Sequence, residues 1–596
     1  MKASIFRGMA WLAAFGLAAN CTAGSNGNFN DGGSAASTGG HVGTGGHGAG
    51  TGLGGLGFGG DFGDSGTCDP KCSTDMHAVL DCNGNVTEQC SGLEGCDLSI
   101  GHCGNACQAA ANNKQSVGCE YYATDMSSFS PDYCFAAFVA NTWNTPAHIV
   151  VDYQGQPLSV GTFTRIPSGQ GPALSYAPYD PVAGLAPSEV AIVFLAGQAG
   201  AAPYCPAPSA IPSGTGPSGT GIFNSFRIET DVPVVAYEIN PYGGGSAAVT
   251  AASLLLPTSV WDLNYIAVNA YRDDIGGPSM NIIASQDNTT VTMLPIAAVQ
   301  GGAGIPAAGA NTQLSFVLQR GQQAQIEQTA ELTGSVLQSD KPIGFMAGHP
   351  CMRVPYGVAY CDHGEQMIPP VQALGSEYVG VMYRPRQGEP AIWRIIGALD
   401  GTTLTWSNDV GGPASLNRGQ IAEFITATPF VVKSQDDDHP FLLFTYMSGS
   451  QWSQLADLGG YGDVDWQLNV PPKQYMTSYV FFADPTYPET NLVIIRAPVG
   501  GQFYDVTLDC AGVLTGWQPV GDYQWTRADL ITGNFQNVGN CSTGRHTITS
   551  DGPFSLGVWG WGTPLTSSFT QNVSYSYPGG MNVQQINQVV IPPIPE

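Results

Sequence analysis

The sequence predicts an all-β protein that contains four related repeats of about 100 residues each. The first observation behind this prediction is a phrase made of a polar turn, a proline and an apolar strand. It occurs at 230–237, 339–348, 438–446 and 550–558. The four prolines of these stretches stand 109, 98 and 113 residues apart. Recurrence at a nearly fixed period is typical of chains assembled from copies of one structural unit.

A second phrase has a similar period and supports the same prediction. In this phrase a proline precedes, by seven or eight residues, a tyrosine that opens an apolar run: Pro257 with Tyr265, Pro370 with Tyr378, and Pro472 with Tyr479. The composition agrees with strands and turns, because charged residues make up only 11% of the chain while glycines number 79 and prolines 42.

The repeats could be arranged in two ways. Each repeat is longer than an ordinary four-stranded propeller blade, which favours packed β-sandwich-like units over the alternative, a closed propeller-like ring. Segment 575–580 looks like the start of a further unit, and we expect it to pair with the edge strand of the first repeat. Three β-hairpins are expected inside the repeats: 280–285 with 290–294, 392–397 with 403–406, and 491–496 with 504–508.

The first 66 residues are expected to be an export signal and a tether. Residues 1–20 have the positive charges and the apolar run of a signal peptide, and that run is too short to span a bilayer. Cys21 stands where a bacterial lipoprotein carries its lipid. Residues 21–66 are rich in glycine and serine, so they predict a flexible tether. We therefore expect an outer-membrane lipoprotein that faces the cell surface, with cleavage and secretion as the alternative.

The cysteines predict disulfide bonds. The chain has 15 cysteines, and setting Cys21 aside leaves 14, an even number that suits an exported protein. Residues 67–115 form a small Cys-rich module with too little apolar content for a core of its own, so bridges should hold it together. Zinc is the alternative, but the spacings lack the paired Cys-x2-Cys knuckle. The candidates in and next to this module are Cys68, Cys72, Cys82, Cys90, Cys96, Cys103, Cys107 and Cys119.

The remaining cysteines belong to residues 116–596, the predicted repeat domain. The pairs expected there are Cys134 with Cys205, Cys351 with Cys361, and Cys510 with Cys541. Their engagement in bridges makes free catalytic thiols improbable.

No enzyme motif stands out in the sequence. It contains no His-Glu-x-x-His, phosphate loop, dinucleotide fingerprint or Gly-x-Ser-x-Gly elbow. His363 and Glu365 could act as an acid–base pair, although hydrogen bonds that tie their loop are the simpler interpretation. Trp559 and Trp561 share one face of a strand and suit either a contact surface or the core.

No cofactor is expected, with calcium as the one candidate. Asp457, Asp463 and Asp465 lie in a glycine-bent loop rich in oxygen ligands, which suits calcium, although their spacing matches no EF-hand. The formal charge of -27 repels phosphate backbones, so we expect no nucleic-acid partner.

Several stretches resemble the N-terminal domain of the IgGFc-binding protein family. They are 118–122, 286–292, 332–343 and 361–370. The resemblance covers roughly residues 116–590 and is greatest to the versions on anchored surface proteins of myxobacteria-like Gram-negative bacteria. It implies a binding role, but no Fc-contacting residue can be carried over to this chain.

These observations predict a non-enzymatic cell-surface binding or adhesion protein, held by its lipid and tether, whose ligand is an extracellular protein or glycan. One alternative is an extracellular carbohydrate-active hydrolase, which would need paired carboxylates or an activated nucleophile in a pocket. The other is a structural spacer in an envelope or matrix.

Overall fold

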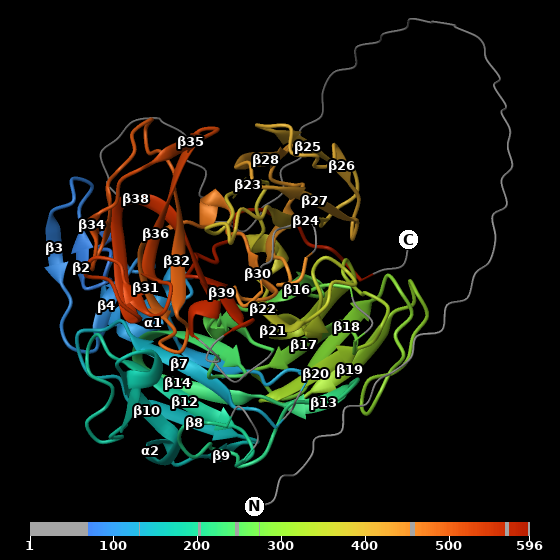
Figure 1. Cartoon of the computed structure of the whole chain (residues 1–596), viewed down its shortest axis with the longest axis horizontal. Helices are drawn as coiled ribbons and strands as arrows, with labels where there is room; N and C mark the ends of the chain where they lie inside the picture. The colour runs from blue at the N-terminus through green and yellow to red at the C-terminus, as the bar shows by residue number, and fades with distance from the viewer. Residues whose placement is uncertain are drawn as a thin grey trace, which may run out of the picture. The chain divides into compact units, whose positions relative to one another are not determined.

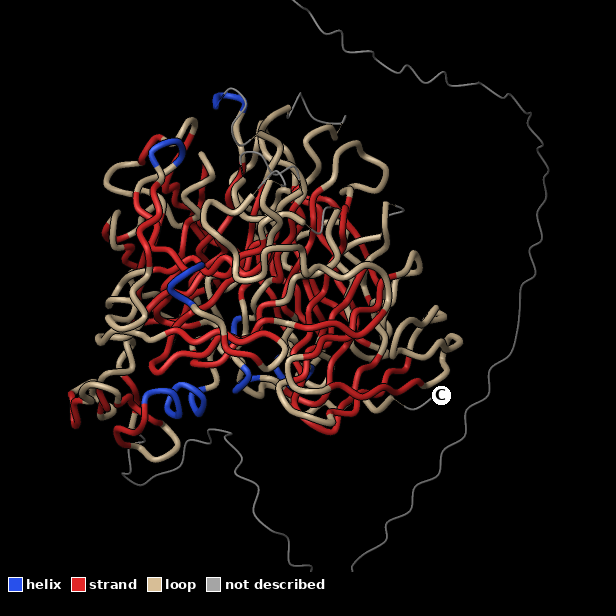
Figure 2. The backbone as a smooth tube through the Cα atoms, turned by 90° about the horizontal axis from the view of Figure 1, so that it is seen from below, coloured by secondary structure: helices blue, strands red, loops and turns tan. Residues whose placement is uncertain are grey.

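The computed structural model describes residues 70–129, 132–200, 204–244, 249–272, 275–452, 459–566 and 571–593. Strands dominate this part, and its helices are short, which confirms the all-β prediction (Figure 2). The expected signal peptide, Cys21 and the tether lie outside the described residues. Within the described part, no helix is long and apolar enough to cross a membrane.

The Cys-rich module consists of short strands and one helix. Its elements are β1 (Lys71–Cys72), β2 (Ala78–Leu80), β3 (Val86–Gln89), β4 (Glu94–Asp97), β5 (His102–Asn105) and α1 (Ala106–Asn113). The Asn105 side chain caps α1 by accepting a hydrogen bond from the Gln108 N–H. The module packs on the repeat domain through Trp143, whose ring lies 4.2 Å from that of His77 and whose Nε1 donates to the Gly92 carbonyl.

The repeat domain contains four sets of strands that follow one plan, with outer strands and inner strands in each set; these form two separate sheets in the third set and a single sheet in each of the others. The first unit comprises β6 (Gly118–Ala123), β7 (Phe135–Asn141), β8 (Ile149–Tyr153), β9 (Gln156–Pro157), α2 (Val160–Phe163), β10 (Thr164–Ser168), η1 (Gly171–Ala173), β11 (Ser175–Pro178), β12 (Val190–Ala196), β14 (Phe226–Asn240) and β15 (Ala251–Leu254). The second comprises β16 (Asp262–Ile266), β17 (Ser279–Ala284), β18 (Thr289–Leu294), β19 (Leu314–Leu318), β20 (Gln322–Glu327), β21 (Val336–Met352) and β22 (Asp362–Met367), and β13 (Gly221–Asn224) pairs with β20.

The other two units repeat this order. The third comprises β23 (Glu377–Gly380), β24 (Ala391–Gly397), β25 (Thr402–Trp406), β26 (Ser415–Leu416), β27 (Ile421–Thr426), β28 (Phe430–Ser434), β29 (Phe441–Met447) and β30 (Asp465–Leu468). The fourth comprises β31 (Met476–Ala483), β32 (Glu489–Arg496), β33 (Val506–Leu508), β34 (Gly512–Val513), β35 (Gln518–Val520), β36 (Tyr523–Thr532), β37 (Gln536–Asn537), β38 (Gly544–Trp561) and β39 (Ser574–Pro578). Short 3-10 turns η2 (Thr258–Val260), η3 (Val371–Ala373) and η4 (Pro472–Gln474) lead into the later units, and η5 (Pro564–Thr566) follows β38.

The recurring proline phrase lies where the chain crosses from the outer sheet to the inner sheet. In three units one long strand, β14, β21 or β38, pairs with outer strands along its first half and inner strands along its second half. The polar residues before the proline therefore belong to a continuous strand, not to the turn expected from the sequence. In the third unit alone the crossing is a break between β28 and β29, where Asp436, Asp437 and Asp438 interrupt the strand.

The two recurring phrases meet through hydrogen bonds. The hydroxyl of a buried tyrosine near the start of each unit donates to the carbonyl of the residue that follows the proline: Tyr121 to Val234, Tyr265 to Ile343, Tyr378 to Phe441, and Tyr479 to Phe554. Because proline cannot donate a ladder hydrogen bond at this point, the tyrosine supplies a side-chain tie across the sheet crossing.

The four inner strands contact one another in a closed cycle. β15 contacts β22 and β39, and β30 contacts the same two strands. In Figure 1 the labels of β22, β30 and β39 accordingly lie between the four units. At this centre the Gln366 amide nitrogen lies 2.9–3.1 Å from the carbonyl oxygens of Ala252, Trp466 and Ser576, one on each other inner strand. The inner strands thus meet around one centre, as in the closed-ring alternative, whereas the packing of each unit as a sandwich stays a prediction.

Two local expectations are wrong. The strands of the three expected hairpins do not pair with each other. β17 and β18 pair with opposite halves of β21, β32 and β33 pair with opposite halves of β38, and β24 and β25 lie in different sheets. The C-terminal strand β39 pairs with β38 of its own unit instead of the first unit. The residues just after β39 contact the chain just before the first unit: the Ser116 N–H donates to the Met581 carbonyl, and the Val583 N–H donates to the Lys114 carbonyl.

Candidate functional site

His363 and Glu365 lie together inside the protein. Both side chains are fully buried on β22, and His363 Nε2 is 3.2 Å from a Glu365 carboxylate oxygen. Burial lowers the pKa of His363 to about 4, and burial and then Asp125 raise the pKa of Glu365 well above its ordinary value. Burial thus favours the uncharged form of both groups. Both residues belong to β22, so their contact lies within one strand, and the buried pair is closed to a substrate in solution in this conformation.

The calcium candidates are divided between the described and undescribed parts of the chain. Asp457 lies outside the described residues. Asp463 and Asp465 are 2% and 0% exposed, and burial raises the pKa of Asp463 to about 7 and that of Asp465 well above its usual range. Asp463 Oδ1 accepts hydrogen bonds of 3.0 Å from the Ser450 and Val464 N–H groups. The calcium site stays a prediction.

A third carboxylate lies near these two. Asp362 on β22 is fully buried, and neither of its oxygens has a hydrogen-bond partner in the described part of the chain. Burial, followed by the charges of Asp463 and Asp465, raises the pKa of Asp362 well above its ordinary value. Asp362 and Asp465 thus have carboxylate oxygens without a described partner. Because an unpaired buried carboxylate is costly, burial favours a proton or a cation on these groups.

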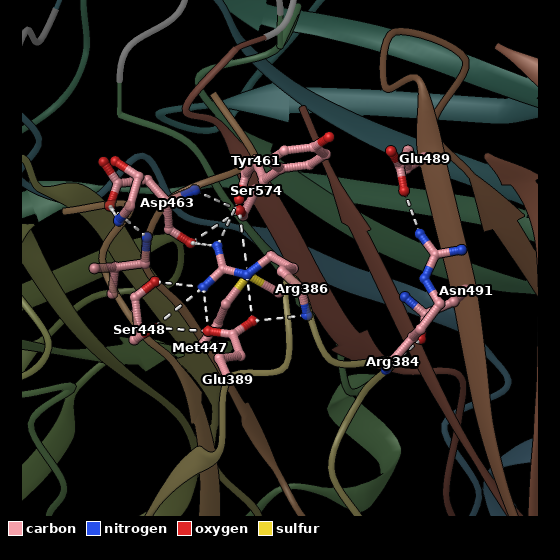
Figure 3. A network of polar contacts seen from close by, with 12 residues as sticks. Arg384, Arg386, Glu389, Met447, Ser448, Tyr461, Asp463, Glu489, Asn491 and Ser574 are labelled. Carbon is pink, nitrogen blue, oxygen red and sulfur yellow. Dashed lines mark hydrogen bonds and ion pairs between the residues drawn. The ribbon is translucent and has the colours of Figure 1, made fainter. Parts of the chain in front are cut away.

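Arg386 is the cation of this region, and its guanidinium is saturated with partners (Figure 3). It forms a two-pronged ion pair with Glu389 and donates to the carbonyls of Ser448 at 2.6 Å and Tyr461 at 2.8 Å. Burial alone would lower the pKa of Arg386, but the attraction of Glu389 outweighs it and the pKa is raised. Ser574 continues the network, since its hydroxyl donates to the Asp463 carbonyl at 3.0 Å. The network joins the third unit to β39.

The aromatic pair Trp559 and Trp561 belongs to the core. Their exposed fractions are 2% and 1%, and both rings pack against Tyr383 at centroid distances of 4.7 and 6.1 Å. Neither ring can serve as a contact surface.

Six disulfides hold the described residues: Cys72–Cys96, Cys90–Cys103, Cys107–Cys119, Cys134–Cys205, Cys351–Cys361 and Cys510–Cys541. Cys82 is also disulfide-bonded, and Cys68 lies outside the described residues. Cys107–Cys119 links the module to the first unit. Among the described residues, Asp509, Cys510 and His546 place possible metal-ligand atoms within 4.8 Å of one another. Cys510 is bonded to Cys541, so its thiolate is not available.

The open polar surface lies between the module and the fourth unit. Three adjoining cavities of about 250, 220 and 620 Å³ share Thr74 in their walls, and we call them together the module groove. Module residues 73–76 form one wall, and β31 and β38 form much of the other. This groove can receive a ligand from solution.

Arg545 on β38 lines the 250 Å³ cavity of the module groove. Sequence reasoning missed this residue, because nothing local distinguishes it from a solvated arginine. Its strand carries Arg545, Thr547 and Thr549 at alternating positions, a pattern that predicts one polar face. That the module covers this face could not be read from the strand itself.

Comparison with known protein families gives one match. The model of the family described as IgGFc binding protein matches residues 251–560, a little over half of the chain. No curated protein sequence matches the chain significantly. The matched residues contain the second and third units and the fourth unit up to Gly560, with the tyrosine–proline ties of all three, while β39 lies beyond the match. The chain therefore belongs to the IgGFc binding protein family.

Proposed function

We propose that this protein is a non-enzymatic binding protein that acts outside the cell and recognises an extracellular protein or its glycans. The family membership supports a binding role. The disulfides support an oxidising environment. A lipid on Cys21 and the tether that follows would hold the protein at the outer membrane, facing outward.

The observation that carries the proposal is the contrast between enclosed and open polar groups. The acid–base pair at His363 and the carboxylates around Asp463 are buried in the ring. The module groove is open, and its walls carry hydroxyl, amide and guanidinium groups. An open surface of donors and acceptors on a cross-linked scaffold suits recognition, since little ordering of the protein is needed on binding.

The test is direct binding of the full chain to immobilised candidates, measured by surface plasmon resonance. The family name makes the IgG Fc fragment the first protein candidate, before and after removal of its glycan, and a glycan array supplies the second class. Saturable binding to either class, without turnover of the ligand, supports the proposal. Release of sugars or peptides from the panel would instead establish a hydrolase, and the absence of any saturable ligand would favour a spacer.

The anchor has its own test. Intact mass of the protein from native membranes should show a diacylglyceryl-type addition on a chain that starts at Cys21. A chain that starts elsewhere without lipid would place the protein in the secreted class.

A further inference from the structure

Arg545 lacks the partners that the other arginines of the described chain have. Its guanidinium makes no hydrogen bond or ion pair with any described residue, and its Nε is buried without a partner. Every other described arginine has at least one hydrogen bond, ion pair or comparable interaction; examples are Arg227, Arg384, Arg386, Arg394 and Arg496. A half-buried guanidinium without an acceptor costs free energy, so an acceptor from outside is the simplest use for it.

The nearest acid to Arg545 is already engaged. Asp509 accepts from His546 Nδ1 at 2.9 Å with one oxygen and from the Thr547 N–H at 2.9 Å with the other. Asp75 also lines the cavity, but Ser73 Oγ and the His77 N–H bind one of its oxygens. Neither carboxylate forms an ion pair with Arg545. The cavity therefore presents a guanidinium that Asp509 attracts through its charge but that no described side chain binds directly.

Hydroxyl groups surround this cation on one face of the strand pair. β31 and β38 are antiparallel, with Ser478 opposite Thr549 and Val480 opposite Thr547, which places these four side chains on the face that carries Arg545. Among the described residues, the Thr547 hydroxyl donates only to the Asp509 carboxylate, at 3.4 Å. The Thr549 hydroxyl has no described hydrogen-bond partner. Across the cavity, Met76, Trp143 and Val235 add apolar walls.

We propose that this cavity binds the carboxylate of an acidic sugar, a uronic or sialic acid residue at the end of an extracellular glycan. This inference rests on the proposed binding function and assigns it a site and a ligand class. Arg545 would pair with the carboxylate, and the hydroxyls of Ser478, Thr547 and Thr549 would exchange hydrogen bonds with those of the ring.

Two features favour a sugar over an acidic peptide. The volume of about 250 Å³ lies just below the range of about 300–1,000 Å³ that drug-sized ligands occupy, so it suits a single ring. A cavity with hydroxyls on one side and apolar groups on the other also matches a sugar, which has hydroxyl edges and an apolar C–H face. An aspartate or glutamate side chain would satisfy Arg545 but leave those hydroxyls without a ligand partner.

The test is calorimetric titration of the full chain with D-glucuronic acid and N-acetylneuraminic acid, with D-glucose as the neutral counterpart. The acids should bind and glucose should bind more weakly. Arg545→Gln should weaken binding of the acids about 10- to 100-fold, and Thr549→Val about 2- to 10-fold. Arg272→Gln is the matched control, because it removes the same charge from a residue whose side chain is 59% exposed in the second unit, and it should leave binding unchanged.

A stability measurement separates binding from a structural role. Without ligand, Arg545→Gln should keep the melting temperature of the parent, since no described contact is lost. A large drop in melting temperature would show that Arg545 is structural and overturn the inference. Binding of a glutamate-rich peptide that depends on Arg545 but is insensitive to Thr549→Val, with no binding of the acidic sugars, would overturn the sugar assignment. Unaltered binding of a protein ligand to the Arg545→Gln variant, again without sugar binding, would refute this site while the proposed function stands.

Discussion

Two arginines, Arg386 at the ring centre and Arg545 in the module groove, show how differently this protein treats charge. Arg386 is fully buried, and its donors are matched by Glu389 and by backbone carbonyls. Arg545 is half-buried and forms no hydrogen bond or ion pair with the described residues, although the charge of Asp509 attracts it. The first is a complete network that holds units together. The second is a group that the fold leaves without a hydrogen-bond acceptor, and a ligand is one of the explanations for such a group.

Removal of the Arg386 guanidinium at the ring centre should have the largest effect on stability. Arg386→Met removes the only guanidinium paired with Glu389 among the described residues, so a buried carboxylate loses its counter-charge. We expect the free energy of unfolding to fall by roughly 3–5 kcal/mol. Urea unfolding monitored by tryptophan fluorescence measures this loss. Arg272→Met, at an exposed and distant ion pair, should cost no more than about 1 kcal/mol. Equal losses in the two variants would contradict the assigned role of the centre.

The tyrosine ties provide the next largest effect. Tyr378→Phe removes a hydroxyl that donates to the Phe441 carbonyl at 2.7 Å and accepts from the Gly375 N–H at 3.1 Å. Because both groups are left buried, we expect a loss of about 1–3 kcal/mol in urea unfolding. Tyr204→Phe, at a residue that is 65% exposed, is the control and should be neutral. A neutral Tyr378→Phe would mean that the tie does not stabilise the sheet crossing.

The buried carboxylates at the centre predict a pH dependence. Burial raises the pKa of Asp463 to about 7, so folded protein binds this proton more tightly than unfolded protein does. Stability from this group is complete at low pH and is lost as the pH rises through 7. Burial lowers the pKa of His363 to about 4, which opposes this trend, but only below about pH 6.5.

We therefore expect the free energy of unfolding to fall by roughly 1–2 kcal/mol between pH 6 and pH 8. Asp463→Asn keeps an oxygen acceptor for the Ser450 and Val464 N–H groups and should flatten this part of the profile. Thermal unfolding across a pH series tests both statements. A profile of Asp463→Asn that falls as steeply as that of the parent would show that another group is responsible.

Calcium gives the smallest expected effect. If the cation binds near Asp463 and Asp465, millimolar calcium at pH 7.5 should raise the free energy of unfolding by about 1 kcal/mol, and a chelator should reverse this gain. Asp465→Asn should remove the calcium effect. Thermal unfolding with calcium, magnesium or chelator measures it, and identical curves under all three conditions would reject the calcium site.

Much of the fold could be predicted from the sequence, because its strongest signals are local and repeated. The spacing of the prolines and of Tyr265, Tyr378 and Tyr479 marks the units, and the structure joins the two phrases by hydrogen bonds. The sequence also predicted where many of the strands lie. It did not predict which strands pair with one another, as the wrongly expected hairpins show.

The pairing error has a physical cause that is visible in the strands themselves. β24 reads Ala-Ile-Trp-Arg-Ile-Ile-Gly and is buried throughout, as a strand with both faces covered should be. β25 reads Thr-Thr-Leu-Thr-Trp and is buried at alternate positions at its start, as a strand with one wet face should be. Two such strands belong to different sheets even when a tight turn joins them. The change from a continuous apolar run to alternating apolar and polar residues therefore indicated that the two strands do not pair.

The site could be predicted less well, because its groups are distant in sequence. Asp463 was singled out, but Arg386 and Asp362 were not. Arg386 meets Ser448 and Tyr461 more than 60 residues along the chain, and Asp362 meets Asp463 and Asp465 of the next unit. Arg545 needed the module, which lies more than 400 residues earlier in the chain, to become part of a cavity. Local sequence patterns do not show which residues far apart in the chain come into contact.

The most direct test of the contrast between the two arginines is urea unfolding of Arg386→Met and Arg545→Met side by side, without ligand. We expect a loss of roughly 3–5 kcal/mol for the first and no loss, or a small gain, for the second, because only the first removes a satisfied buried partner. A comparable loss for Arg545→Met would show that Arg545 is another structural cation and would leave the groove without its recognition group.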